Sequence, residues 1–225
     1  MSIKIAILGA GWLGLPLSQH LSQIGLKNDL ITTKDLPQIK SWEQYDLLIS
    51  TWPKENIQAF THLPKDKQLM AMSSTSQTDA MLKFEDELQS LFPNLTILRL
   101  GGLIGYNRHP GKFLSGKNGL KGKNHFINLI HRDDIIQIIT EMILQNTIPK
   151  KILHLVCDKP CRKKEFYTFA SQERGLTVPN FDEMDNSEKP AIDGTKIKKI
   201  LNYEFIYSSP FDYLKALRER KNNRT

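Results

Sequence analysis

The chain has 225 residues, of which 40% are hydrophobic and 24% charged, as is ordinary for a soluble globular protein with a sizeable core. No apolar run approaches the roughly 20 residues of a membrane span. An apolar strand directly after the first residues leads us to expect no signal peptide and a cytoplasmic location. Cys157 and Cys161 lack a second ligand pair, so they indicate neither a zinc site nor a structural disulfide.

The net charge of +7 is concentrated in one segment. Between Leu88 and Arg132 there are seven Lys and Arg residues and no Asp or Glu, and the rest of the chain is balanced. This distribution favours one locally bound anion over a nucleic acid or a membrane held on a diffuse basic surface. A solvated basic loop that binds nothing is the alternative.

The first stretch of the chain has the order of a dinucleotide-binding unit. Ile3–Leu8 reads as a buried parallel strand, and a helical pattern follows that ends at Gly25. Between strand and helix stand the glycines of a GxGxxG motif, Gly9, Gly11 and Gly14. They allow a sharp turn, close approach of a pyrophosphate to the backbone, and close packing of helix on strand.

The N–H groups of Trp12 and Leu13, together with the helix dipole, are then predicted to face the cofactor phosphates. The alternative is a tight turn that binds nothing.

The second strand is expected over residues 29–33, and its end bears on the choice of cofactor. An acidic residue usually stands there and holds the ribose hydroxyls of NAD. Here the sequence reads Thr32-Thr33-Lys34, and Lys34 is suited to a 2′-phosphate. The pattern therefore favours NADP, but NAD stays open because Asp29 and Asp35 flank the turn.

Later apolar runs predict strands and helices in alternation. The expected strands cover residues 45–50, 67–72, 95–100, 126–130 and 151–156, and the expected helices cover residues 81–91 and 131–144. Alternation of this kind predicts an α/β fold with a doubly wound, Rossmann-like parallel sheet. We predict a single NAD(P)-binding domain over residues 1–225, with a small C-terminal substrate lobe from about 103–125 and 157–225.

Residues just past the strand ends are expected to line the ligand crevice. The candidate cofactor contacts beyond the glycine turn are Thr32, Thr33, Lys34, Thr51, Trp52, Gly101 and Gly102. Simple packing is an equal alternative for Trp52.

Residues 107–125 are rich in glycine and lysine and have little apolar periodicity. Within this loop we predict that Arg108–Lys123 forms a mobile lid that closes on an anionic substrate and is poorly ordered without it, because its cations lack a compensating acid. The candidate substrate contacts are Tyr106, Arg108, His109 and Lys112.

Four stretches together resemble the extended and atypical short-chain dehydrogenase/reductases, the NAD-dependent epimerase/dehydratase family. They are ILGAGWLG, MSSTS, ILRLGGLIG with NRHPGKF, and NLIHRDDI. The resemblance implies a Rossmann-like fold, NAD(P), and catalysis by a Tyr-x-x-x-Lys motif with a serine. Ser74 matches the serine, with Thr75 beside it, and Lys83 can be aligned with the lysine. That alignment puts Asp79, four residues before Lys83, where the tyrosine belongs. No tyrosine lies between Tyr45 and Tyr106.

The sequence therefore leaves two functions open. The first is an NAD(P)-dependent oxidoreductase or epimerase/dehydratase acting on an anionic, phosphorylated or nucleotide-linked metabolite. The second is a catalytically degenerate NAD(P)-binding sensor or scaffold. Nucleic-acid binding is weaker because no recognised motif appears, and the predicted strands near residues 126 and 151 argue against a hydroxyacid dehydrogenase. No metal site is predicted, and a homodimer stays open.

Overall fold

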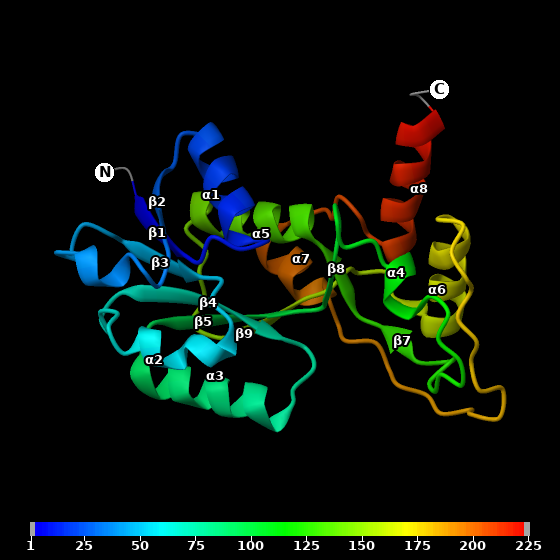
Figure 1. The fold of residues 1–225 in the computed structure, drawn as a ribbon. Helices are drawn as coiled ribbons and strands as arrows, with labels where there is room; N and C mark the ends of the chain where they lie inside the picture. The colour runs from blue at the N-terminus through cyan, green and yellow to red at the C-terminus, as the bar shows by residue number, and fades with distance from the viewer. Residues whose placement is uncertain (1–2, 223–225) are drawn as a thin grey trace. The chain divides into compact units, whose positions relative to one another are not determined.

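The computed structural model describes residues 3–222 and separates into two compact units. Unit 1 comprises the residues up to Leu100 together with Ile136–Leu153. Unit 2 comprises Gly101–Ile135 and the residues from His154 onward. The colour ramp of Figure 1 makes this discontinuity visible, because the chain leaves the main sheet after β5 and returns to it at β9.

Unit 1 is built on a six-stranded sheet with the order β2-β1-β3-β4-β5-β9. The strands are β1 (Lys4–Leu8), β2 (Lys27–Ile31), β3 (Leu47–Ser50), β4 (Gln68–Ser74), β5 (Leu95–Leu100) and β9 (Ile152–Leu155). The pairings of β1 with β2 and β3, and of β4 with β3 and β5, are parallel. All four residues of β3 are buried, which explains its continuous apolar sequence.

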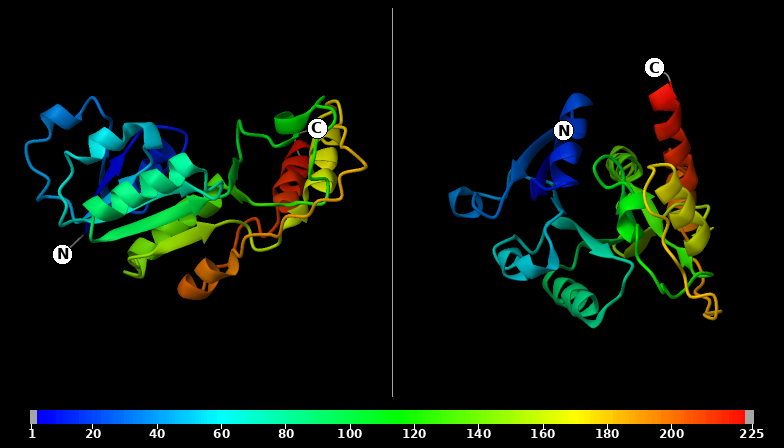
Figure 2. Two further views of the ribbon diagram at one scale, coloured as in Figure 1. Left: turned by 90° about the horizontal axis from the view of Figure 1, so that it is seen from below. Right: turned by 45° about the vertical axis from the view of Figure 1, so that its right-hand side comes forward.

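Helices cover both faces of this sheet. Figures 1 and 2 show α1 (Gly14–Gln23) and α5 (Arg132–Leu144) on one face, and α2 (Ile57–Phe60) and α3 (Asp79–Leu91) on the other. Short 3₁₀ turns, η1 (Leu36–Gln38) and η2 (Lys54–Asn56), complete the connections. Phe60 of α2 packs edge-on against Phe84 of α3 and against Phe92, with ring centroids 5.8 and 6.5 Å apart. The predicted doubly wound, Rossmann-like α/β fold is thereby confirmed.

In its described residues, up to Asn222, unit 2 contains two small sheets and four complete helices. One sheet pairs β6 (Gly102–Ile104) with β8 (Leu129–His131) in parallel, and the other pairs β7 (Phe126–Ile127) with β10 (Cys161–Arg162) antiparallel. The helices are α4 (Gly111–Leu114), α6 (Lys163–Gln172), α7 (Thr195–Leu201) and α8 (Pro210–Asn222).

The prediction of one strand over residues 126–130 was wrong, because Asn128 divides it. The Asn128 backbone carbonyl accepts the Gly102 N–H at 2.7 Å, and its side-chain Oδ1 accepts the Ile192 N–H at 2.8 Å. The first bond continues the parallel pairing of β6 with β8 and the second ties Asn128 to Ile192, so β7 and β8 on either side of Asn128 have different partners.

Both cysteines are buried free thiols, and burial raises the pKa of Cys157 to about 12. Within residues 3–222, no helix has the length and apolarity needed to cross a bilayer. The same residues contain no group of three or more His, Cys, Asp or Glu side chains suited to a metal ion.

Candidate functional site

The strand order places a topological switch point at β1. The chain moves from β1 to β2 on one side and then to β3 on the other, which opens a crevice at the carboxyl ends of β1 and β3. Hydrogen bonds join the residues that follow these ends. Gly9 N–H donates to the Ile31 carbonyl at 2.7 Å, and Thr51 N–H donates to the Leu8 carbonyl at 2.8 Å.

Each glycine of the motif has a different geometric role. Gly9 has a φ of +106°, and a Cβ there would lie 2.7 Å from the Thr51 Oγ1, so the turn requires glycine. A Cβ on Gly14 would lie 1.8 Å from the Gly9 carbonyl oxygen, so only glycine lets α1 start this close to the turn. A Cβ on Gly11 would have no atom within 4 Å, so the backbone there borders open space.

The N-terminus of α1 is available to an anion. No side chain caps it at Leu13, and its first turn contains no acidic residue. The first N–H groups of a helix lack intrahelical acceptors, and the dipole makes this end positive. Trp12 and Leu13 precede Gly14 directly, as the predicted role of their N–H groups requires.

The two acids that flank the turn after β2, Asp29 and Asp35, both accept hydrogen bonds from nearby protein groups. The Asp35 carboxylate accepts the Thr32 N–H at 2.6 Å and the Thr32 hydroxyl at 2.7 Å, and these bonds lower the Asp35 pKa. Asp29 is bound by Lys4 at 2.9 Å and by the Tyr45 hydroxyl at 2.8 Å, and its pKa is lowered chiefly by Lys4.

Three residues between these acids were predicted to meet the cofactor, and of these Thr33 and Lys34 are exposed and Thr32 is half-buried. Because β2 ends at Ile31, the whole Thr32–Lys34 stretch lies just past the carboxyl end of the strand.

Trp52 is 4% exposed and packs edge-on against Phe60 at 5.4 Å. Its ring lies beside the glycine turn, since a Cβ on Gly9 would be 3.0 Å from the Trp52 Cδ1. Trp52 therefore supports the turn from the core, and its contact with a cofactor stays a prediction.

Ser74 ends β4, and Thr75 follows it with its N–H bonded to the Leu100 carbonyl at 3.0 Å. The Ser74 Oγ accepts the Ser76 N–H at 3.1 Å. Lys83 lies in a groove between α2 and α3, beside Ile57 and Leu91. Among the described residues no hydrogen bond or ion pair joins Lys83 to Ser74. A catalytic role for these residues stays a prediction.

A buried charged network beside Ser74 was not predicted. Glu85 of α3 is 2% exposed, and it accepts a bidentate pair of bonds from Arg99, with Nη2 to Oε2 at 2.6 Å and Nε to Oε1 at 2.9 Å. The Ser73 hydroxyl donates to the same carboxylate at 2.5 Å. The network ties α3 to the ends of β4 and β5. The sequence held one signal for it, a lone arginine inside the apolar run Leu95–Leu100.

Gly101 and Gly102 lie in unit 2, where close packing accounts for both. A Cβ on Gly101 would lie 2.6 Å from the Asn128 carbonyl oxygen, and one on Gly102 would lie 2.6 Å from the Leu129 side chain. Their predicted contact with a cofactor is not tested by this packing.

Tyr106 occupies a strained position on the surface of unit 2. Its φ is +55°, a left-handed conformation that is costly for a tyrosine, and its side chain is 57% exposed. The Arg132 guanidinium lies 3.6 Å from the ring centroid, and the hydroxyl donates to Asp133 at 2.8 Å. Cation, ring and carboxylate thus form one exposed group at the start of α5.

The other candidate substrate contacts in unit 2 differ in exposure. Arg108 and Lys112 are exposed, and Arg108 closes a tight turn by exchanging backbone hydrogen bonds with Gly105. His109 is 3% exposed, and its Nδ1 accepts the Gly111 N–H at 3.1 Å, which gives it a structural role in the start of α4. Direct contact of these three residues with a substrate stays a prediction.

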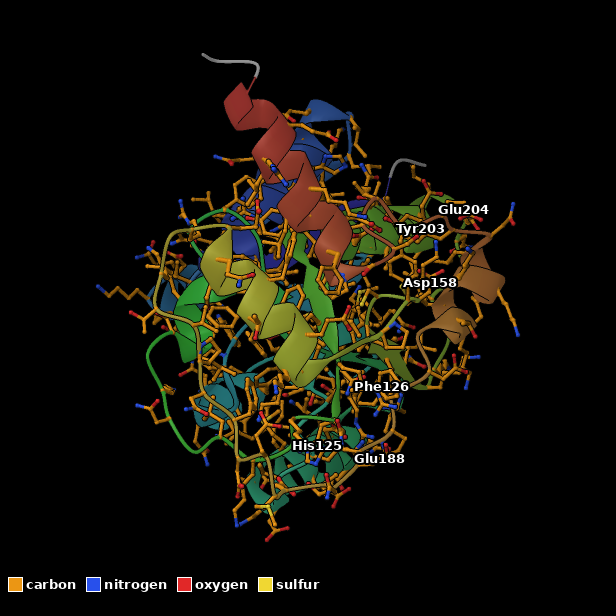
Figure 3. The ribbon with its side chains drawn as sticks, turned by 90° about the vertical axis from the view of Figure 1, so that its right-hand side faces the viewer. His125, Phe126, Asp158, Glu188, Tyr203 and Glu204 are labelled. Carbon is orange, nitrogen blue, oxygen red and sulfur yellow. The ribbon has the colours of Figure 1, made fainter. Side chains whose placement is uncertain are left out.

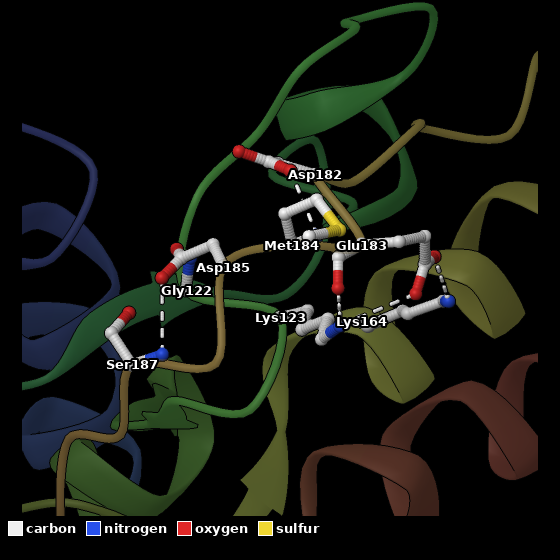
Figure 4. Close-up of polar contacts among 8 residues, drawn as sticks. All are labelled: Gly122, Lys123, Lys164, Asp182, Glu183, Met184, Asp185 and Ser187. Carbon is white, nitrogen blue, oxygen red and sulfur yellow. Dashed lines mark hydrogen bonds and ion pairs between the residues drawn. The ribbon is translucent and has the colours of Figure 1, made fainter.

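Residues 116–126, the basic segment, are anchored rather than free. A second stretch, residues 177–192, runs along the basic segment, and we name it the strap. Backbone bonds join the two at Gly116–Thr177, Leu120–Asn180 and Phe126–Lys189. Glu183 of the strap accepts from Lys123 and Lys164, and Asp185 accepts the Gly122 N–H at 2.6 Å (Figure 4).

The anchoring continues at the other end of the strap, where Glu188 accepts a hydrogen bond from Arg162 and the Ser187 hydroxyl bonds the ring of His125. Figure 3 labels His125 and Glu188 in this part of unit 2. Phe113 and Leu114 already pack on the aromatic core of unit 2.

The expectation that these cations lack a compensating acid is wrong at Lys123, which pairs with Glu183. Asp185 meets the same segment through the Gly122 N–H, and both acids are about 60 residues away in sequence, where no local pattern reveals them.

Several solved structures share this fold over nearly the whole chain. A Methylobacillus flagellatus protein described as an NAD-dependent epimerase/dehydratase matches with a TM-score of 0.71 and 18% identity, covering 97% of this chain and 100% of that one. The human epimerase family protein SDR39U1 (isoform 2), solved with NADPH, matches with a TM-score of 0.67 and 15% identity over 96% and 99% of the two chains.

UDP-glucuronic acid 4-epimerase from Bacillus cereus, solved with UDP-glucuronic acid and NAD, gives a TM-score of 0.63 and 14% identity over 96% and 100%. The fold is thus that of the Rossmann-like NAD-dependent epimerase/dehydratase proteins, as the resemblance in the sequence predicted.

Among curated proteins, Protein YeeZ of Escherichia coli K12 is 27% identical over 92% of this chain and 97% of its own length. That alignment extends over 270 positions against the 225 residues here, so this chain lacks segments that YeeZ has. No protein-family model matches the sequence.

Proposed function

We propose that this protein binds NADP(H) at the glycine turn of unit 1 and acts as an epimerase/dehydratase-like oxidoreductase on an anionic metabolite. The observation that carries the proposal is the turn at the β1/β3 switch point, where Gly11 borders open space and the N-terminus of α1 is uncapped. Backbone N–H groups at such a helix start bind a pyrophosphate.

The residues around this turn fit a dinucleotide. Gly9 and Gly14 are required by the geometry of the turn, so Gly11 is the glycine whose missing side chain serves a ligand. Thr32, Thr33 and Lys34 would face the adenosine ribose from the end of β2, and Thr51 would border it from the end of β3. When bound, the nicotinamide would supply or accept a hydride.

The preference for NADP rests on the charges at the end of β2. Because Asp29 and Asp35 are both engaged by other groups, neither is poised for the ribose hydroxyls that an acid grips in NAD-specific sites. Lys34 is exposed and supplies the charge that a 2′-phosphate requires.

The anionic substrate is assigned to unit 2 on the basis of charge. Unit 2 holds 20 of the 31 Lys and Arg residues but only 13 of the 24 Asp and Glu residues, so it carries the entire net charge of +7. The positive electrostatic potential that this charge creates favours phosphorylated and nucleotide-linked metabolites. Tyr106, Arg108 and Lys112 are its exposed candidates for direct contact.

One observation favours a second function, an NADP-binding sensor or scaffold without turnover. Only four residues, Thr75–Thr78, connect β4 to α3, and α3 supplies no tyrosine. Ser74 could hydrogen-bond a substrate oxygen, but the phenol that would move the proton is missing from this connection and from α3.

The test is calorimetric titration of the protein with NADPH and NADH. We expect NADPH to bind more tightly by about tenfold, since a charge-assisted phosphate contact contributes about 1–3 kcal/mol. Gly11→Val should abolish binding and leave the far-UV circular dichroism unchanged. Lys34→Ala should remove the preference, and Lys40→Ala, an exposed lysine on the same connection, should keep it.

Tight binding of NADPH by Gly11→Val would refute the site, and equal affinities for NADPH and NADH would refute the preference. A screen of sugar nucleotides by nicotinamide absorbance then separates the two functions, because a sensor binds NADPH without turnover.

A further inference from the structure

The carboxylate of Glu183 lies between two lysines from different segments of unit 2. Lys164 Nζ is 2.5 Å from its Oε1, and Lys123 Nζ is 3.4 Å from its Oε2 and also donates to the Glu183 backbone carbonyl (Figure 4). Each carboxylate oxygen therefore has its own lysine. These hydrogen bonds, that of Lys164 first, lower the Glu183 pKa, so the group is an anion at neutral pH.

Backbone hydrogen bonds fix these lysines in place. Lys164 N–H donates to the Lys123 carbonyl at 3.1 Å, which aligns the two residues across the segments. Lys163 adds a third cation nearby, with its Nζ on the Lys121 carbonyl at 2.8 Å. The backbone thus aligns the two lysines of the pair, while Glu183 is the partner of both of their ammonium groups.

Glu183 is held loosely compared with its surroundings. Its side chain is 65% exposed and that of Lys164 is 47% exposed, and ion pairs this exposed contribute little to stability. A phosphate group carries up to two negative charges and three strong acceptor oxygens, so it competes well with a single carboxylate for two lysines.

The strap can release Glu183 without detaching. Asp185 is fixed two residues later by the Gly122 N–H at 2.6 Å and the Ser187 N–H at 3.0 Å. A hydrogen bond from the Ser187 side chain, followed by these two backbone bonds, lowers the Asp185 pKa to about 2. On the other side, the Asp182 N–H donates to the Leu120 carbonyl at 2.9 Å.

We propose that Lys123 and Lys164 form a binding site for a phosphate-type anion, and that Glu183 occupies this site as an internal competitor. The ligand displaces the carboxylate, and the strap stays attached at Asp182 and Asp185. The inference deepens the proposed function, since it rests on the assignment of an anionic ligand to unit 2.

The experiment is titration of the full chain with inorganic pyrophosphate in the Gly11→Val background, which removes the proposed pyrophosphate contact of unit 1 and serves as the wild type for this site. Glu183→Gln should bind pyrophosphate about two- to fivefold more tightly than the wild type, because it removes the weak exposed pair that the ligand has to break. Glu188→Gln is the matched control, since it removes one charge from the same strap but pairs with Arg162 instead. Its affinity should stay closer to that of the wild type. Lys164→Ala should lose binding.

Equal gains in Glu183→Gln and Glu188→Gln would overturn the proposal in favour of a general charge effect. Unchanged binding in Lys164→Ala would also overturn it.

Titration with NADPH distinguishes the anion site at Lys123 and Lys164 from the proposed cofactor site in unit 1. Gly11→Val should lose NADPH and keep the pyrophosphate response, so failure at one site is distinguishable from failure at the other.

Discussion

The two units of this protein hold their charges in opposite ways. Unit 1 has as many basic as acidic residues, and its Glu85–Arg99 pair is almost entirely out of water. Unit 2 carries the whole net charge, and its pairs at Glu183 and Glu188 are largely exposed. The buried pair of unit 1 is therefore little screened by salt, whereas the exposed pairs of unit 2 respond to ions and ligands.

The largest effect is expected from breaking the buried pair of unit 1. Arg99→Met should destabilise the protein by about 3–5 kcal/mol, because it leaves the buried Glu85 carboxylate uncompensated. The double variant Glu85→Leu/Arg99→Met should recover most of this loss, since both charges are then removed. Urea denaturation of the three proteins measures the difference. A loss below 1 kcal/mol in Arg99→Met would show that the pair is better solvated than its burial indicates.

The glycine turn gives the next largest effect. Gly14→Ala should cost about 3 kcal/mol, because its new Cβ would lie 1.8 Å from the Gly9 carbonyl oxygen and would force α1 away from the turn. Gly11→Ala is the matched control, with no atom within 4 Å of its Cβ, and should change stability by less than about 1 kcal/mol. Thermal or urea unfolding checks both, and similar values for the two variants would contradict the packing described for Gly14.

Asp134 makes unit 2 sensitive to pH. Burial raises its pKa from 3.8 to about 6, although it accepts bonds from the Tyr203 hydroxyl and the Ile206 and Tyr207 N–H groups. A raised acid pKa means that the folded state binds the proton more tightly. Its contribution to stability is thus complete below pH 4 and is lost as pH rises through 6.

We expect the wild type to lose on the order of 2 kcal/mol relative to Asp134→Asn between pH 4 and pH 7. Denaturation at several pH values measures this difference, and parallel pH profiles for the two proteins would refute it.

The smallest effect is expected at the exposed pair of unit 2. Lys164→Ala should change stability by less than about 1 kcal/mol, and 0.5 M salt should reduce even this difference. A loss comparable to that of Arg99→Met would show that the strap contributes much more to folding than its exposure indicates.

Unit 1 was predictable because its determinants are local. The glycine motif, the apolar strand runs and the helix periodicity are patterns of neighbouring residues. They predicted the parallel sheet and the turn at Gly9 correctly. Strand β5 was predicted at its observed bounds, Leu95–Leu100. Strand β2 was placed two residues late, because its polar residues Lys27 and Asn28 carry no apolar signal.

Unit 2 was poorly predicted because its contacts join distant segments. The basic segment was expected to be mobile, since no acid lies near it in sequence, yet Glu183 and Asp185 meet it in the fold. Asn128 interrupts an apolar run with two hydrogen bonds to residues that sequence periodicity does not connect to it.

The discontinuity of unit 1 also constrains how the chain is made. Strand β9 pairs at the edge of the main sheet beside β5, yet it is synthesised only after the 35 residues of Gly101–Ile135 have emerged from the ribosome. Until then β5 exposes unpaired backbone groups, and open strand edges of this kind recruit other chains into aggregates. A nascent or truncated protein that ends before Ile152 therefore exposes β5 as an unpaired edge strand that is prone to aggregation. Quality control in the cell is expected to act on this chain most strongly during that interval of its synthesis.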